Sequence, residues 1–251
     1  MKQITTVFAA IVMSFFLYGN CLAEGTVSLH GATTLEKIIK AKQADIEAKA
    51  GVKIEVVGNG TGRGLEELAG GKTDIAMIGG PLSVNAAVIN EKTPDLIKPA
   101  ELKEELLFTM PAVVIVNPAN TGVEMLKADQ LKGLLTGAIK NWKEVGGADV
   151  PVVVVAPSPG DGVRSFIQAS LLKEEKLAAD TRIMQVSPDV PKVVSQIPGG
   201  VAVVSSKHAD SSVKTIKTDA SMDVPFSLVT KIGPKDPIPA VINAVKELAK
   251  P

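Results

Sequence analysis

Residues 54–82, IEVVGNGTGRGLEELAGGKTDIAMIGGPL, decide the fold that we expect for this chain. The stretch begins as a strand, passes through alternating glycines at residues 58–64 and continues as a helix that two further glycines end. A second strand, residues 74–78, leads into a glycine turn at residues 79–81. A strand, a glycine loop and a helix start aim unpaired backbone N–H groups and the positive end of the helix dipole at one point. The stretch therefore predicts a site for a small ligand that is negatively charged or accepts hydrogen bonds.

Strand and helix patterns alternate along the rest of the chain. The strands that we expect are residues 26–30, 106–116, 150–155 and 201–205, and the helices are residues 35–49, 82–92, 128–135, 163–176 and 239–250. Pro111 lies inside the second of these strands and indicates an interruption where the chain crosses between two parts of the molecule. Alternation of this kind predicts an α/β fold with largely parallel sheets.

Composition excludes several classes of function. Hydrophobic residues make up 45% of the 251 residues and charged residues 22%, which is typical of a globular protein with a core. The formal net charge is zero, so we expect no nucleic-acid partner. The chain has only two histidines, His30 and His208, and no Gly-x-Ser-x-Gly motif. We therefore predict no bound metal, no other cofactor and no enzymatic activity.

The first 23 residues predict a cleavable secretory signal peptide, because Lys2 precedes an apolar core and the chain offers a cleavage site before Glu24. A lipoprotein acylated at Cys21 is the alternative, but Asn20 stands where a small residue would be expected. Cleavage would remove the only cysteine and with it any disulfide or thiolate metal site. We therefore expect an exported, periplasmic protein.

Four parts of the sequence resemble a known family. They are residues 31–34 (GATT), residues 58–64 with 71–76, residues 114–120 with 131–147, and residues 197–203. In this order they resemble the periplasmic phosphate-binding proteins of ABC transporters, which have the type 2 periplasmic binding protein fold. The resemblance implies an α/β fold of two lobes with a ligand cleft between them. After the signal peptide, residues 1–23, we expect lobe 1 to comprise residues 24–110 plus 206–251 and lobe 2 to comprise residues 111–205.

The ligand loops depart from the pattern of that family. Phosphate-binding members hold the anion with an arginine, an aspartate and groups at three helix starts. Here Gly79 stands where the aspartate is expected, and no arginine opens the third loop, residues 157–163. In that loop Asp161 replaces a serine and Val163 replaces a threonine. A desolvated carboxylate repels a phosphate dianion, so we predict weak or absent phosphate binding. A less charged oxyanion, a carboxylate compound bearing an amine, or no ligand fits better.

The candidate ligand contacts come from the three loops and are Thr33, Thr34, Gly60, Thr61, Gly62, Gly79, Asp161, Gly162, Val163 and Arg164. Either threonine can instead cap the first helix, and the glycines can serve only a tight turn. Asp161 can instead cap the helix that follows it, or pair with Arg63 or Arg164. We interpret Trp142 as a packing residue of the second lobe.

Together with the predicted export, the resemblance implies an exported solute-binding protein, which we expect to be a monomer. It would capture a small molecule, in particular an oxyanion or another anion, and deliver it to an ABC transporter permease. An extracytoplasmic sensor or scaffold with a degenerate ligand site is the alternative, because loss of the phosphate contacts permits it. A ligand-induced rise in melting temperature would favour the first class over the second.

Overall fold

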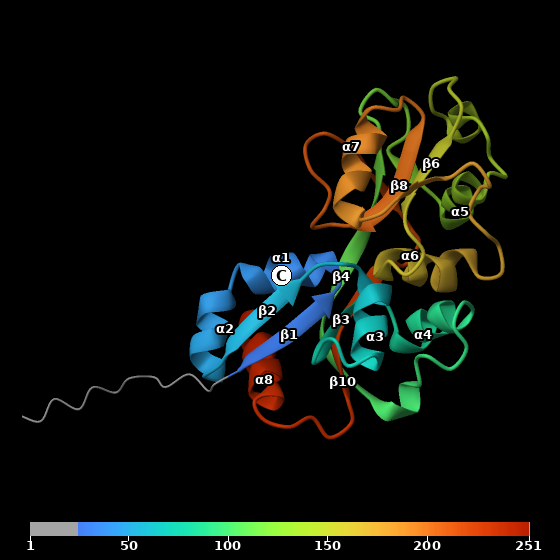
Figure 1. Cartoon of the computed structure of the whole chain (residues 1–251). Helices are drawn as coiled ribbons and strands as arrows, with labels where there is room; N and C mark the ends of the chain where they lie inside the picture. Colours follow the sequence, from blue (N-terminus) through green and yellow to red (C-terminus); the bar gives the residue numbers. More distant parts are fainter. Residues whose placement is uncertain (1–24, 251) are drawn as a thin grey trace, which may run out of the picture.

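The computed structural model of the chain describes residues 25–250, and the predicted signal peptide lies outside this range. The described residues form two α/β lobes, one above the other in Figure 1, with β4 running between them. The predicted fold class is therefore confirmed. Within residues 25–250, none of the helices has the length and apolar character needed to cross a membrane.

The elements that build the two lobes alternate along the chain. The strands are β1 (Thr26–Gly31), β2 (Lys53–Val57), β3 (Ile75–Gly79), β4 (Leu102–Val116), β5 (Met125–Leu126), β6 (Val153–Pro157), β7 (Arg182–Met184), β8 (Gly200–Ser205), β9 (Lys214–Thr218) and β10 (Asp223–Lys231). The helices are α1 (Thr33–Lys40), α2 (Gln43–Ala50), α3 (Thr61–Ala69), α4 (Leu82–Asn90), α5 (Ala128–Thr136), α6 (Gly162–Ile167), α7 (Val190–Ser195) and α8 (Ile238–Leu248).

In the first lobe the strand order is β2-β1-β3-β10, and β4 follows β10. The sequence of β3 is apolar without interruption because all five of its residues are buried. Ile75 and Met77 pack into the cluster that α1, α2 and α8 share, whereas Ala76 and Ile78 face the cluster formed with α3 and α4. Side chains on a strand alternate between its two faces, so a strand covered by helices on both sides must be apolar throughout.

The second lobe repeats this arrangement around β8, which has β4 on one side and β6 on the other. Val201 and Val203 of β8 pack into the main cluster, which also contains residues of α5 and α6. Ala202 and Val204 face the opposite side, where they pack with residues of α7. Strand β7 extends the sheet beyond β6 as a parallel edge strand.

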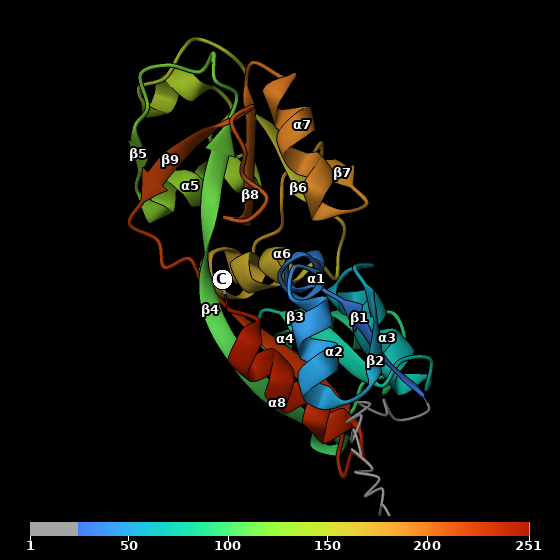
Figure 2. The ribbon, with the colours of Figure 1, turned by 90° about the vertical axis from the view of Figure 1, so that its left-hand side faces the viewer.

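Strand β4 passes through both lobes, as Figure 2 shows. Up to Pro111 it pairs with β10, and from Ala112 onward it pairs with β8 and β9. The predicted interruption at Pro111 is wrong, because the strand continues and changes its partners instead. A proline has no N–H to give to a neighbouring strand, and this residue lies where one set of pairings ends.

The boundary between the two lobes was predicted from the family resemblance. The division into residues 24–110 plus 206–251 and residues 111–205 stays a prediction. Strand β9 pairs with the second half of β4, with Ile216 opposite Val114. We therefore propose that the chain returns to lobe 1 between β9 and β10 rather than directly after β8.

Two predictions about helices and one about the sheets are wrong. The helix expected at residues 35–49 is two helices, and nothing in the sequence explains the break between Lys40 and Gln43. The helix expected at residues 163–176 ends with a π-helical turn at Leu172, since Lys173 has a positive φ of 56°. The sheets are mixed rather than largely parallel, because β10 and β4 run antiparallel to their neighbours.

Candidate functional site

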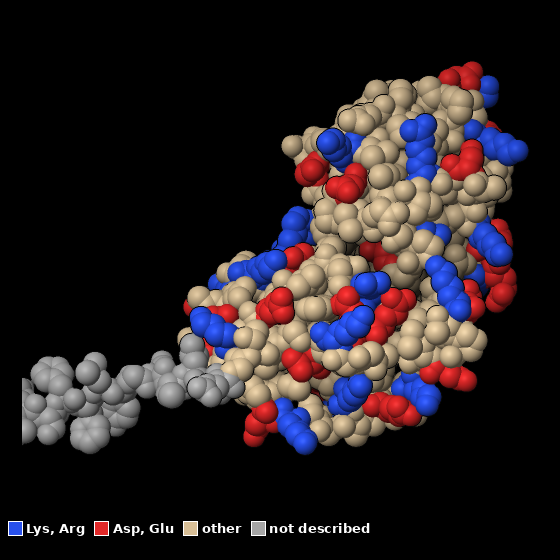
Figure 3. All heavy atoms as spheres, in the orientation of Figure 1, with Lys and Arg blue, Asp and Glu red and all other residues tan. Residues whose placement is uncertain are grey.

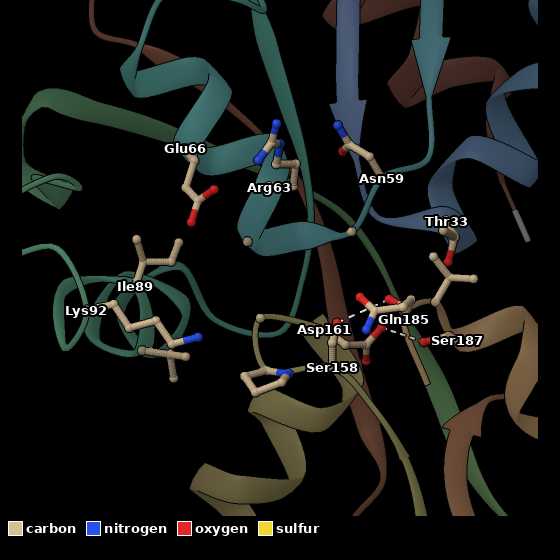
Figure 4. A pocket seen from close by; sticks show the side chains of 16 residues that line it. Thr33, Asn59, Arg63, Glu66, Ile89, Lys92, Ser158, Asp161, Gln185 and Ser187 are labelled. Atoms are coloured by element: carbon tan, nitrogen blue, oxygen red, sulfur yellow. Dashed lines mark hydrogen bonds between the residues drawn. The ribbon is translucent and has the colours of Figure 1, made fainter. Parts of the chain in front are cut away.

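Loops at the carboxyl ends of three strands meet between the lobes. The loops follow β1, β2 and β6, and after each loop a helix begins, at Thr33, Thr61 and Gly162 respectively. The carboxyl ends of parallel strands are where α/β proteins place their ligands. A cavity of about 180 Å³ lies between the loops (Figure 4). Over the face of the molecule seen in Figure 3, basic and acidic side chains are interspersed.

Both lobes contribute to the wall of this cavity. From the first lobe the lining residues are Thr33, Asn59, Gly60, Gly62, Arg63, Glu66, Val88, Ile89 and Lys92. From the second lobe they are Ser158, Pro159, Gly160, Asp161, Gln185, Val186 and Ser187. Among the predicted contacts, those in the wall are Thr33, Gly60, Gly62 and Asp161, and those outside it are Thr34, Thr61, Gly79, Gly162, Val163 and Arg164.

The two threonines of the first loop do not cap α1. Ala32 is the N-cap residue, and no side chain accepts a hydrogen bond there. The backbone N–H of Ala32 donates to the carbonyl oxygen of Met77 (2.8 Å), which places the helix start against the end of β3. The capping interpretation is therefore wrong, because Thr33 and Thr34 are the first two helical residues. Thr33 lines the cavity, whereas Thr34 is buried outside it.

The glycines of the second loop have structural reasons to be glycine. Gly60 has a φ of 96°, which is costly for any residue with a β-carbon. Gly64 packs so closely on β1 that a β-carbon would overlap the carbonyl group of His30. Thr61 is 1% exposed, and its hydroxyl oxygen accepts from the N–H of Gly79 (3.0 Å). The glycine loop is thereby fixed to the end of β3.

Gly79, which stands at the position of the family aspartate, has little room for a side chain. A β-carbon there would lie 3.0 Å from the ring of Phe226 and 3.5 Å from the Cα atom of Gly162. Gly162 comes from the opposite lobe. The ring of Phe226 in β10 is thus the main obstacle to a side chain at residue 79, and the backbone of the second lobe lies at van der Waals distance from the same position.

Asp161 caps α6. Its Oδ1 atom accepts from the N–H groups of Val163 and Arg164, both at 3.0 Å, and its Oδ2 atom accepts from the hydroxyl of Ser187. Burial raises the pKa of the Asp161 carboxyl above its ordinary value, although these hydrogen bonds and the nearby Arg164 guanidinium act in the opposite direction. The capping interpretation is confirmed, and the carboxylate also lines the cavity.

Neither arginine pairs with Asp161 in the part of the chain that the structure describes. Arg164 donates from Nη1 to the carbonyl oxygen of Pro157 (2.6 Å), and burial lowers the pKa of its guanidinium. Arg63 is 62% exposed and donates to Glu67 (3.0 Å). In Figure 4 Arg63 points away from Asp161, whereas the ammonium group of Lys92 points into the space between the lobes. The cation best placed to meet a ligand is therefore Lys92, at the end of the α4 region.

Several lining residues were missed by the sequence reasoning, namely Asn59, Glu66, Lys92, Ser158, Gln185 and Ser187. The parallel pairing of β7 with β6 brings residues 185–187 beside the third loop. A strand of three residues is too short to give a clear alternating pattern, so this placement has no strong sequence signal.

Asp161 allows a test of capping against charge. We expect Asp161→Ala to lower the free energy of unfolding by about 1 kcal/mol, because alanine cannot accept the two amide hydrogen bonds. Asp161→Asn should be close to neutral at pH 7, since asparagine caps equally well and removes a poorly solvated charge. The raised folded pKa means that wild type loses stability relative to Asp161→Asn as the pH rises through that pKa. Urea unfolding between pH 3 and 8 measures both effects, and equal losses in the two variants would contradict the capping role.

Glu67 connects the first two loops. Its carboxylate accepts from His30 Nδ1 (2.7 Å), Asn59 Nδ2 (2.9 Å) and Arg63 Nε (3.0 Å). Burial alone would raise the pKa of Glu67, but these hydrogen bonds lower it below its ordinary value. The network holds the glycine loop against the end of β1.

We expect Glu67→Gln to lower the free energy of unfolding by about 1.5–3 kcal/mol at pH 7, because charge-assisted hydrogen bonds are lost. The lowered folded pKa means that this contribution is present above the unfolded pKa of about 4.3 and is lost as the pH falls further. Chemical unfolding at pH 7 and at pH 3 should therefore show the difference between wild type and variant shrinking. The exposed neighbour Glu66 provides the control, since Glu66→Gln should change stability by less than about 0.5 kcal/mol.

Two α/β lobes that enclose a polar cavity at their strand ends are the architecture of the type 2 periplasmic binding protein fold. The chain belongs to the family described as "PBP superfamily domain", which matches residues 22–248. It is 26% identical over 204 residues to the phosphate-binding protein PstS of Bacillus subtilis (strain 168), a match that covers 80% of this chain and 64% of that protein. With PstS of Staphylococcus aureus (strain USA300) it shares 26% identity over 165 residues, which is 64% of this chain and 49% of that protein.

Solved structures give the same class. A Clostridium perfringens protein described as a phosphate ABC transporter substrate-binding protein, solved with bound phosphate, superposes with a TM-score of 0.77 at 26% identity, covering 88% of this chain and 93% of that one. An ABC-type phosphate transport receptor of Vibrio cholerae shares the fold, with a TM-score of 0.65 at 21% identity over 89% and 98% of the two chains. The chain spans less than two thirds of the length of the two PstS relatives. The relatives support a solute-binding protein and are in line with the prediction of a non-enzyme.

Proposed function

We propose that the protein is an exported solute-binding protein that captures a small polar ligand between its lobes and presents it to an ABC transporter permease. The observation that carries this proposal is the cavity of about 180 Å³, whose wall combines the loops after β1, β2 and β6 with residues of both lobes. A ligand that touches both lobes stabilises their closed arrangement, and a closed arrangement is something a partner can recognise. The descriptions of the relatives as phosphate-binding and ABC transporter proteins support the same role.

The ligand that fits best carries less negative charge than a phosphate dianion. The cavity is lined by two carboxylates, Asp161 and Glu66, and two cations, Lys92 and Arg63, so the charges of its wall balance. Arg63 is turned toward Glu67 and away from Asp161. A monoanion, or a carboxylate compound with an amine for Asp161, would meet complementary charge on both sides.

An extracytoplasmic sensor or scaffold with a degenerate site is the second candidate. One observation favours it: the N–H of Gly62 at the start of α3 already donates to the carbonyl oxygen of Gly160 in the other lobe (2.8 Å). This N–H is a donor that a helix start would otherwise offer to an anion. A partner protein can recognise the closed arrangement of such lobes even when no ligand is bound.

Export is part of the proposal. We expect mass spectrometry of extracytoplasmic material to find a mature chain that begins at Glu24. A chain that begins with an acylated Cys21 would instead make the protein a lipoprotein, and retention of the first 23 residues would contradict processing.

Native mass spectrometry of the freshly purified protein tests ligand capture directly. We expect a second species heavier by the mass of one small molecule, which denaturing conditions remove. Lys92→Gln should reduce the fraction of this species, whereas Lys72→Gln, an exposed lysine outside the cavity wall, should leave it unchanged. The absence of any bound species, together with no rise in melting temperature over a panel of organic acids and amino acids, would favour the sensor or scaffold.

A further inference from the structure

Four glycines bring the backbones of the two lobes into contact at the cleft. Gly62 and Gly79 belong to the first lobe, and Gly160 and Gly162 belong to the second. The N–H of Gly62 donates to the carbonyl oxygen of Gly160 at 2.8 Å. A β-carbon on Gly62 would lie 3.2 Å from the Cα atom of Gly160, and one on Gly162 would overlap the backbone of Gly79. Contacts this close are possible only between residues without side chains.

These contacts leave no room for a ligand atom between the paired glycines. A hydrogen bond of 2.8 Å between two backbone groups is already at the usual distance for such a bond. An oxyanion that approached the N–H of Gly62 from the side of Gly160 would have to replace that bond. The cavity lies beside the contact, with Gly62 and Gly160 in its wall.

Two further contacts between the lobes accompany the glycines. A β-carbon on Gly80 would lie 2.8 Å from the carbonyl oxygen of Gly162, so α6 begins directly against the turn after β3. At another point between the lobes, Lys37 of α1 donates from Nζ to the carbonyl oxygen of Lys207 (3.3 Å). The lobes are therefore joined by protein atoms alone at more than one place.

We propose that Gly62, Gly79, Gly160 and Gly162 form a glycine latch that closes the lobes without a ligand and confines any ligand to the cavity beside it. In the latch, the backbones of the two lobes touch each other directly, and no bound molecule is needed to bridge them. The latch therefore does not depend on the proposed transport role. A ligand of this protein would then add to an existing closed state rather than create it.

Gly162→Ala is the variant that tests the latch most directly. Gly162 is the first residue of α6 and does not have a positive φ, so alanine is compatible with the local backbone. The obstacle to its β-carbon is the backbone of Gly79 in the other lobe. Gly70→Ala is the matched control, because Gly70 lies at the end of α3 with an ordinary φ of −75° and its β-carbon would meet only carbonyl groups of its own helix.

The distance between the lobes can be measured by double electron–electron resonance. Spin labels would be attached to the chain from Glu24 onward, which has no native cysteine, through Lys42→Cys and Lys192→Cys, two exposed positions in different lobes. The protein would be unfolded, freed of small molecules and refolded before measurement, and circular dichroism would verify that each variant is folded.

We expect the ligand-free wild type to show one short distance distribution that matches the structure. Gly162→Ala should increase the population with a longer distance by on the order of tenfold, the effect expected when a hydrogen bond and its packing are lost, and Gly70→Ala should not. A ligand-free wild type that is mainly open would overturn the latch, as would a Gly162→Ala protein that stays closed. A wild type that is open and closes only with a bound molecule would refute the latch but leave the transport role standing. A wild type that is closed and binds no small molecule would support the latch and refute the transport role.

Discussion

Replacement of Trp142 by alanine is expected to lower the free energy of unfolding by about 3–5 kcal/mol. The indole is 0% exposed and belongs to the main hydrophobic cluster. Its Nε1–H donates to the carbonyl oxygen of Gly199 at 2.9 Å. Alanine would leave a large cavity and would remove one of the two hydrogen bonds that this carbonyl accepts, the other coming from the N–H of Val153 (2.9 Å), so both losses act in the same direction.

Trp142→Phe separates these two contributions. Phenylalanine fills much of the same space but cannot donate to Gly199, whose carbonyl oxygen keeps the N–H of Val153, so we expect a loss of about 0.5–1.5 kcal/mol. The chain has one tryptophan, so unfolding must be followed by circular dichroism rather than by indole fluorescence. Trp142 lies outside the cavity wall, and ligand capture by the folded variants should be unchanged. A loss below about 1 kcal/mol in Trp142→Ala would contradict the packing role.

Patterns confined to neighbouring residues predict this fold well. In residues 54–82 both expected strands fall within one residue of β2 and β3, whereas α3 begins at Thr61, inside the run of glycines that was expected to precede the helix. Local chemistry explains the strand ends and the helix end, because the glycines at 58, 60 and 70–71 interrupt the periodic patterns, whereas Gly62 and Gly64 are accommodated inside α3.

Elements that depend on distant partners were harder to predict. Strand β10 was not expected, although it joins β3 to β4. Its sequence contains Pro225 and a fully buried Ser227, and its register shifts after Phe226, so no regular alternation marks it. Only its two neighbours, which are distant in sequence, make it a central strand.

The residues of the candidate site also fall into two groups, those that local sequence patterns indicated and those that distant packing brings to the cavity. Thr33, Gly60, Gly62 and Asp161 come from loops whose composition indicated a site, and they line the cavity. Lys92 and the segment around Gln185 enter the wall only through the packing of α4 and the pairing of β7. The approach of Gly162 to Gly79 depends on how the lobes meet, which no local pattern encodes.

Inorganic phosphate is expected to bind roughly a hundredfold or more weakly than it would to a site with both an arginine and an aspartate in contact with the ion. Each charge-assisted contact is worth about 1.5–3 kcal/mol. Arg63 and Asp161 line the cavity, but Arg63 donates to Glu67, and Asp161 already accepts from the start of α6 and from Ser187, so neither takes the role of the family arginine or aspartate. Gly79 has no side chain, and Arg164 donates to Pro157 outside the cavity. The Gly62 N–H is also occupied by Gly160. Isothermal titration of ligand-free protein measures the affinity, and micromolar or tighter binding would refute this expectation.

Asp161→Ser shows whether the carboxylate contributes to this exclusion. Serine caps a helix about as well as aspartate, so α6 should persist while one negative charge leaves the cavity. We expect phosphate affinity to rise by about tenfold or more, because two charges near 4 Å repel by up to about 4 kcal/mol at an effective dielectric constant of 20. Asp45→Ser removes an exposed charge far from the cavity wall and should leave the affinity unchanged. If titrations of both variants match wild type, the missing arginine and aspartate alone account for weak binding, and Asp161 acts only as the cap of α6.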